Sequence, residues 1–336
     1  MKNELHTLQI VRGVAAMMVV TNHLWGTVFG GIFKYNGGLG VDIFFVLSGF
    51  LMVFTQKETR GPIEFLSGRI FRIYPMYILV SLPLIIMMVE VNNPFKILSN
   101  LFLIPTFGQL QHRLANDPAW TLVYEMIFYV MFSASLLISQ NKVKSCLIVC
   151  TMLLFSVCLF SFYLAPQPRF GWINLGYILG DSLLIDFGMG CLLAILYEKI
   201  NYNKRLAFPL FVALTLGVIY ASLIYITGPR IIKFGLPALV IITLAIYSSH
   251  GHGVIYKILH VIGDASYSIY LSHLYFAWAM HNSVNTKDIA SIDAEVATLL
   301  FTGMCIAFGI FINITVERPI MRYVADRKKA RRAMPV

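Results

Sequence analysis

The chain has 336 residues, of which 58% are hydrophobic and 12% charged, and its mean hydropathy is +0.75. An ordinary soluble domain has about 25% charged residues, so this composition excludes that class and indicates a membrane protein. The net charge of +10 does not indicate a nucleic-acid partner, because seven of the 26 basic residues lie in the last 19 positions, where they are expected to contact anionic lipid head groups.

Ten apolar stretches are candidates for membrane-spanning helices, each of which needs about 20 mostly apolar residues. They cover residues 8–28, 39–56, 70–90, 120–139, 145–165, 174–197, 206–227, 234–249, 265–282 and 295–316. We predict an all-α, polytopic fold with about ten transmembrane helices, in which residues 1–320 form one membrane domain and 321–336 a basic cytoplasmic tail. The stretch 96–108 is too short to cross and is expected to be re-entrant or interfacial.

The distribution of Lys and Arg predicts that both termini are cytoplasmic. With the N-terminus inside, 19 of the 26 basic residues fall on the cytoplasmic side and seven on the outer side, and basic residues favour cytoplasmic loops. The first stretch is interpreted as a retained helix rather than a signal peptide, because it is long and contains Arg12 and His23. The five cysteines lack metal-ligand spacing, and no metal site is expected.

The first predicted helix contains two ionisable residues, Arg12 and His23. Ionisable side chains are costly in hydrocarbon, so their presence there indicates a functional site. Eleven residues are just over three helical turns, which puts both side chains on one face about 16 Å apart. We interpret His23 as a candidate general base at the outer end, with Arg12 toward the cytoplasm.

The second predicted helix begins with the sequence GGLGVDIFFVLSGF and contains Asp42 one turn from its outer end. A carboxylate beside an imidazole fixes the imidazole tautomer and raises its basicity. Asp42 is therefore a candidate partner of His23. The alternatives are that it caps the helix or pairs with another cation.

Arg69 and Arg72 lie in the sequence RIFRIYP at the cytoplasmic start of the third predicted helix. Their i, i+3 spacing puts both guanidinium groups on one face, where they suit a phosphate-rich ligand that arrives from the cytoplasm. Paired arginines at such a helix end are also common membrane anchors, so the alternative is a purely structural role.

Two later stretches add candidate residues for substrate binding or structural support. The sequence WTLVYEMIFYV contains Trp120, which suits a membrane interface, and Glu125 and Tyr129, which share a helix face. Glu125 is expected either to order the reaction centre or to neutralise a buried arginine. The sequence SYSIYLSHLYF contains His273, which is expected to line a pocket or to hydrogen-bond between helices.

Taken together and in this order, these motifs resemble the acyltransferase-3 family of membrane O-acyltransferases. The resemblance also includes GVDIFFVLSGFLM and the terminal VERP, and it covers nearly the whole chain. It implies an acyl-CoA donor, usually acetyl-CoA, bound from the cytoplasm, and a sugar hydroxyl of a cell-surface polysaccharide or its lipid-linked precursor as acceptor. It implies the enzyme class of acyltransferases that transfer groups other than aminoacyl groups. It also implies a multi-pass protein in the inner membrane of a bacterium.

The resemblance also implies roles for individual residues. It identifies His23 as the essential catalytic residue and Arg12 as its companion, and it points to Arg69 and Arg72 for the donor. Asp42 matches a position that is acidic or polar in the family. Membrane lipids and polysaccharide-assembly proteins are the further expected partners.

Two other function classes are alternatives to an acyltransferase. Buried Arg, Asp, Glu and His residues also suit a proton-coupled secondary transporter of a small polar solute. Such transporters often have repeated halves with interrupted helices, and this sequence has no such internal match. A non-catalytic scaffold would give no reason for Arg12 and His23 to share one buried face.

Overall fold

The structure, a computed structural model, describes residues 6–26, 28–57, 59–90, 92–107, 113–163, 173–200, 206–285 and 293–333. Within these ranges every regular element is a helix, and the β interactions are two isolated bridges, Thr106 with Asn174 and Leu206 with Ser248. The prediction of an all-α fold is confirmed. Five basic residues used for the orientation argument lie outside the described residues: Lys2, Arg169, Lys204, Arg205 and Lys287.

The described residues form fourteen α-helices and four short 3-10 or π segments, labelled η. The helices are α1 (His6–Leu24), α2 (Asn36–Thr55), α3 (Pro62–Met88), α4 (Pro94–Phe102), α5 (Trp120–Ile138), α6 (Lys142–Tyr163), α7 (Leu175–Gly180), α8 (Leu183–Lys199), α9 (Phe208–Ile224), α10 (Leu236–Ile246), α11 (Val254–Asp264), α12 (Ser266–Asn285), α13 (Ala294–Ile312) and α14 (Arg318–Ala333). The short segments are η1 (Gly31–Lys34), η2 (Asp117–Ala119), η3 (Ile231–Gly235) and η4 (Asn313–Glu317).

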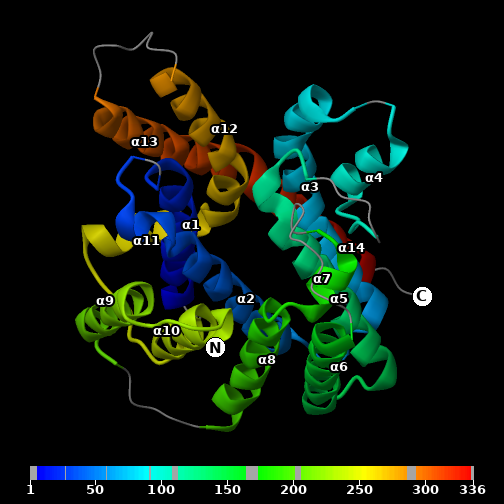
Figure 1. Cartoon of the computed structure of the whole chain (residues 1–336). Helices are drawn as coiled ribbons and strands as arrows, with labels where there is room; N and C mark the ends of the chain where they lie inside the picture. Colours follow the sequence, from blue (N-terminus) through cyan, green and yellow to red (C-terminus); the bar gives the residue numbers. More distant parts are fainter. Residues whose placement is uncertain are drawn as a thin grey trace.

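Helix α2 lies between two groups of helices, one of which contains α1, α10 and α12 and the other α3, α5 and α6 (Figure 1). It packs closely on α1 and α8 and also contacts α10. Its contact with α8 is unusually close at two glycines: a Cβ atom would lie 2.0 Å from the carbonyl oxygen of Phe187 at Gly49, and 2.0 Å from that of Val46 at Gly190. Small residues allow helix backbones to approach in this way, which is typical of membrane helix pairs.

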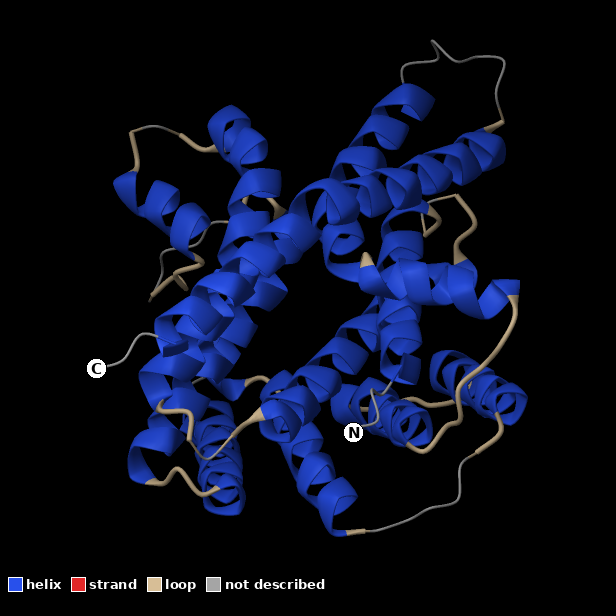
Figure 2. Cartoon of the chain, turned by 180° about the vertical axis from the view of Figure 1, so that it is seen from behind, coloured by secondary structure: helices blue, strands red, loops and turns tan. Residues whose placement is uncertain are grey.

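The C-terminal elements form one long rod. Helix α13, the π segment η4 and α14 follow one another without a break between Ala294 and Ala333. Figure 2 shows this rod crossing the near face of the molecule. The rod joins the two groups of helices, because α13 packs against α12 and α14 contacts α3. Glu317, the last residue of η4, is thereby brought next to α12.

Five helices in the described part of the chain have the length and apolar composition that a membrane crossing requires. They are Asn36–Thr55, Pro62–Met88, Asp117–Ile138, Lys142–Ser161 and Ala294–Arg327, and two shorter apolar helices cover Phe208–Ile224 and Ile231–Ile246. These helices, like the composition, indicate a membrane protein. The number of ten crossings and the cytoplasmic position of both termini stay predictions.

The predicted helix 174–197 is in fact two helices. Helix α7 ends at Gly180, and Asp181 has an extended backbone with φ −80° and ψ 135°. The Oδ1 atom of Asp181 accepts a hydrogen bond of 3.1 Å from the backbone N–H of Leu183, at the start of α8. Aspartate favours such helix starts because its carboxylate satisfies an otherwise unpaired N–H group. The stretch 96–108 overlaps the short helix α4, which ends at Phe102 and has Leu103 as its C-cap residue.

Candidate active site

A cavity of about 900 Å³, open solvent included, lies between α1, α2, α3, α5, α12 and η4. Four ionisable residues line it: Arg12 from α1, Arg72 from α3, Glu125 from α5 and Glu317 from η4. The rest of the lining is mainly apolar and aromatic: Val41, Phe44, Phe45, Leu47, Ser48, Leu51, Met52, Ile73, Thr121, Leu122, Tyr129, Tyr267 and Tyr270. An apolar cavity with a few convergent polar groups is typical of a small-molecule site.

The carboxylate of Glu125 is held by two hydroxyl groups. Ser48 Oγ donates a hydrogen bond of 3.0 Å to Glu125 Oε1, and the Tyr129 hydroxyl donates to the same oxygen atom. Ser48 belongs to α2, whereas Glu125 and Tyr129 belong to α5. The i, i+4 pairing expected from the sequence is therefore formed, and a third residue from another helix joins it.

The two arginines of the third predicted helix have different environments. Arg72 lines the cavity, whereas Arg69 is not among the described residues that line it. Arg69 is buried, with 8% of its surface exposed, and its Nη2 donates a hydrogen bond of 3.3 Å to Thr55 Oγ1. Its guanidinium lies 5.4 Å from the ring centroid of Phe65 and 5.9 Å from that of Tyr129. Arg69 therefore packs behind the cavity wall, and Arg72 faces the cavity.

Arg12 and His23 belong to one continuous helix, α1, as their spacing predicts. Arg12 donates a hydrogen bond of 2.9 Å from Nη1 to Gln9 Oε1 and lines the cavity. His23 lies at the other end of α1, is exposed, and its ring centroid is 4.9 Å from that of His273 on α12. The sequence pattern made His273 a candidate for substrate binding or structural support, but it did not indicate the contact of His273 with His23.

The histidine pair lies next to a residue of the cavity wall. The ring of Tyr270, which lines the cavity, has its centroid 5.7 Å from that of His273. The Tyr270 hydroxyl donates to the carbonyl oxygen of Pro118 at 2.6 Å and lies 2.8 Å from Thr121 Oγ1. Tyr270 therefore contacts both the cavity and the His23–His273 pair, through His273.

Asp117 is a carboxylate near His23 that the sequence analysis missed. It lies in η2, directly before α5, and its charge interacts with that of His23. Its Oδ1 atom is buried and has no hydrogen-bond partner among the described residues. The sequence signal was weak, because Asp117 precedes Pro118 and has the pattern of an ordinary helix start.

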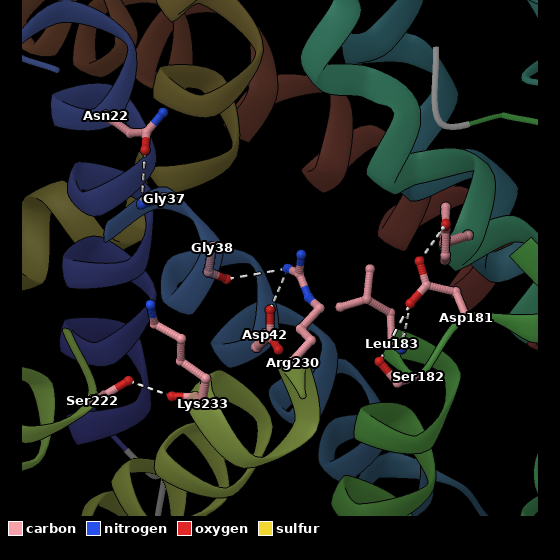
Figure 3. A network of polar contacts seen from close by, with 11 residues as sticks. Asn22, Gly37, Gly38, Asp42, Asp181, Ser182, Leu183, Ser222, Arg230 and Lys233 are labelled. Atoms are coloured by element: carbon pink, nitrogen blue, oxygen red, sulfur yellow. Dashed lines mark hydrogen bonds and ion pairs between the residues drawn. The ribbon is translucent and has the colours of Figure 1, made fainter. Parts of the chain in front are cut away.

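Asp42 has a different partner from the one proposed on sequence grounds. It is fully buried, and its Oδ2 atom forms an ion pair of 2.5 Å with Arg230 Nη2, as Figure 3 shows. Arg230 also donates to the carbonyl oxygen of Gly38 at 3.4 Å. In the described part of the chain, no hydrogen bond or ion pair joins Asp42 to His23. Of the alternatives left open, pairing with another cation is the one that the structure contains.

Asp186 and Asp181, which the sequence left unassigned, lie near this ion pair. Both interact electrostatically with Arg230, and Asp186 also interacts with Asp42. Asp181 accepts a hydrogen bond of 3.0 Å from the Tyr124 hydroxyl through Oδ2. The cluster thus joins α2, α8 and the residue before η3. Nothing in the local sequence of Arg230 indicates a buried partner.

The remaining predicted residue, Trp120, is half-buried at the start of α5. Its ring centroid is 5.3 Å from that of Tyr124 and 6.5 Å from that of Phe45, which lines the cavity. Glu317, from the terminal VERP motif, lines the cavity and accepts hydrogen bonds of 2.6 Å from Ser268 Oγ and 2.9 Å from Asn313 Nδ2. Across the described residues, no group of three or more His, Cys, Asp or Glu side chains is arranged to hold a metal ion.

Comparison with known proteins identifies relatives along almost the whole chain. The sequence model of the acyltransferase-3 family, which describes an acyltransferase domain, matches residues 5–318. The exopolysaccharide production protein ExoZ of Rhizobium meliloti is 27% identical over 318 residues, which cover 88% of this chain and 92% of ExoZ. The O-acetyltransferase OatA of Staphylococcus aureus is 26% identical over 310 residues, which cover 78% of this chain and 49% of OatA. No solved structure matches.

Proposed function

Because this chain belongs to the acyltransferase-3 family, we propose that it is a membrane O-acetyltransferase that moves an acetyl group from acetyl-CoA to a sugar hydroxyl. The acceptor in this proposal is a cell-surface polysaccharide or its lipid-linked precursor. Support comes from the relatives, one of which is named for exopolysaccharide production and another for O-acetyl transfer. The location in this proposal is the inner membrane of a bacterium, with several crossings.

The observation that carries the proposal is a cavity that is lined by two arginines and by a tyrosine in contact with a histidine pair. Arg12 and Arg72 line it, and Tyr270, which also lines it, contacts His273, whose ring centroid lies 4.9 Å from that of His23. CoA carries phosphate groups, which guanidinium groups bind through charge-assisted hydrogen bonds. We therefore assign the CoA phosphates to the Arg72 side, with the pantetheine arm passing Arg12 toward His23.

In the proposed reaction His23 acts as general base. Its neutral imidazole takes the proton of the sugar hydroxyl, and the oxygen attacks the thioester carbonyl carbon. The C–S bond then breaks, and the CoA sulfur receives the proton from the imidazolium. The products are the sugar ester and free CoA, and His23 returns to its neutral form. An acyl-histidine intermediate is the competing route, in which His23 attacks the thioester itself.

The residues around Arg12 and Glu125 have supporting roles in this scheme. Glu125, held by Ser48 and Tyr129, balances the positive charge of the cavity wall. Acyl transfer also builds negative charge on the carbonyl oxygen, which a positioned donor stabilises. The exposed position of His23 at the end of α1 is compatible with an acceptor that arrives from the outer side of the membrane.

The test is the release of free CoA from acetyl-CoA by purified protein in detergent, with chito- and cello-oligosaccharides as acceptor probes. We expect release by the wild type and a loss of at least 100-fold in His23→Ala, since general base catalysis contributes about 10²–10⁴-fold. Equal release by both proteins would remove His23 from the mechanism. Absence of release by the wild type would contradict acetyl-CoA as donor and favour a carrier.

A further inference from the structure

The buried histidine of α12, His273, has an arrangement that defines its proton positions. Its side chain is fully buried, and its Nδ1 atom lies 2.5 Å from the carbonyl oxygen of Tyr270, one helical turn earlier. A carbonyl oxygen can only accept a hydrogen bond, so Nδ1 must carry the proton in that contact. In the neutral imidazole the lone pair is then on Nε2, which becomes an acceptor.

This Nε2 atom is the part of His273 that has no partner. It is buried and makes no hydrogen bond within the described residues. Buried polar atoms are nearly always paired in folded proteins, so an orphaned one points to a group that it is positioned to meet. The nearest aromatic ring from another element is that of His23, with a centroid distance of 4.9 Å and an interplanar angle of 49°.

The distance between the two rings suits a hydrogen bond. An N–H···N hydrogen bond of about 3 Å between two imidazole rings places their centroids about 5 Å apart. The exposed side chain of His23 can rotate to direct an N–H toward the buried acceptor, whereas His273 is held by its backbone contact. The fixed ring can therefore orient the mobile one.

We propose that His273 is a positioning residue, whose Nε2 accepts the N–H of His23 and so fixes the tautomer in which the other His23 nitrogen takes the acceptor proton. This inference rests on the proposed function, in which His23 is the base. The N–H that faces His273 is not transferred in the reaction, because the hydroxyl proton goes to the opposite nitrogen and then to the CoA sulfur. A neutral imidazole thus has the orienting role that carboxylates have in many catalytic triads.

Asp117 is the competing partner for the same N–H. Its charge acts on His23 from η2, and its Oδ1 is also without a hydrogen bond among the described residues. In the proposed arrangement Asp117 stabilises the imidazolium once the proton has been taken, and His273 orients the ring before that. Substitutions of His273 and of Asp117 distinguish the two residues, because only the partner of the N–H group orients His23.

The test uses two substitutions of His273 that keep different halves of the imidazole. His273→Gln keeps an acceptor near the Nε2 position, whereas His273→Asn keeps a polar group near Nδ1 and loses the acceptor. In the CoA-release assay we expect His273→Asn to lower kcat at least tenfold with the KM for acetyl-CoA unchanged. We expect His273→Gln to keep at least a third of the wild-type kcat.

The outcomes separate the inference from the function on which it rests. Equal kcat values for the Gln and Asn variants would overturn the positioning role, and so would a loss confined to Asp117→Asn, which would identify Asp117 as the acceptor. Undiminished activity of His23→Ala would overturn both the general base and this inference. As a check without substitution at His273, ¹⁵N NMR of histidine-labelled wild type should show a neutral ring protonated on Nδ1, and protonation on Nε2 would contradict the proposal.

Discussion

Arg69 and Arg72 show how far sequence spacing alone can predict the environment of a side chain. Their i, i+3 separation places them on one side of α3, yet Arg72 faces the cavity and Arg69 packs between Phe65, Tyr129 and Thr55. Residues three apart differ in direction by about 60° around a helix, since successive residues turn by about 100°. That difference is enough to separate a residue that faces the cavity from one that packs behind its wall.

We therefore expect different defects when each arginine is replaced by lysine. Arg72→Lys should raise the KM for acetyl-CoA about tenfold, because losing one hydrogen bond to a charged group costs about 1.5–3 kcal/mol. Arg69→Lys should instead lower the melting temperature, because lysine cannot keep the stacked, forked contacts of a buried guanidinium. Kinetics of CoA release and thermal unfolding in detergent measure both. A similar rise of KM in the two variants would show that Arg69 also binds the donor.

At the scale of helices, the sequence predicts where a helix forms better than it predicts whether that helix is interrupted. Each of the ten predicted stretches contains helix, because apolar runs of this length are a local property. The break at Asp181 was not predicted, since it depends on a side chain that caps α8 and also contacts Tyr124 on α5. The sequence also does not predict the role of the glycines on α2 and α8, because that role depends on which helix packs against each glycine.

The close contact of α2 and α8 gives a prediction at this scale. Gly190→Ala should destabilise the protein by about 1–3 kcal/mol or more, because its Cβ would overlap the Val46 carbonyl oxygen, and overpacking a tight interface costs that much. Gly217→Ala on α9 is the matched control, since nothing lies within 4 Å of its Cβ position. Melting temperature and recovery from size-exclusion chromatography compare the two. Equal stability of Gly190→Ala and wild type would mean that the two helices are not in close contact.

At the scale of the whole molecule, the orientation in the membrane rests on the distribution of basic residues. Lys34, in η1, and Lys57, after the end of α2, are both exposed and lie on either side of a helix that meets the requirements for a crossing. The charge distribution predicts that Lys34 is outside and Lys57 is cytoplasmic.

Cysteine labelling tests this orientation. In a cysteine-free background, a membrane-impermeant maleimide should label Lys34→Cys in intact cells and Lys57→Cys only after the membrane is permeabilised. The reverse pattern would invert the orientation of α2 and place the His23 end of α1 in the cytoplasm. Labelling of both positions from one side would show that α2 does not cross the membrane.

The membrane class, the all-helical fold and the joint location of Arg12 and His23 on one helix follow from the sequence, because composition and helical spacing are local properties. The contacts that the candidate site residues make with distant parts of the chain do not follow from the sequence. Asp42 pairs with Arg230, 188 positions later, and His23 meets His273 on α12. Such pairs depend on the rotation and tilt of each helix against its neighbours. These are set by the packing of all the helices together, so no short stretch of sequence contains them.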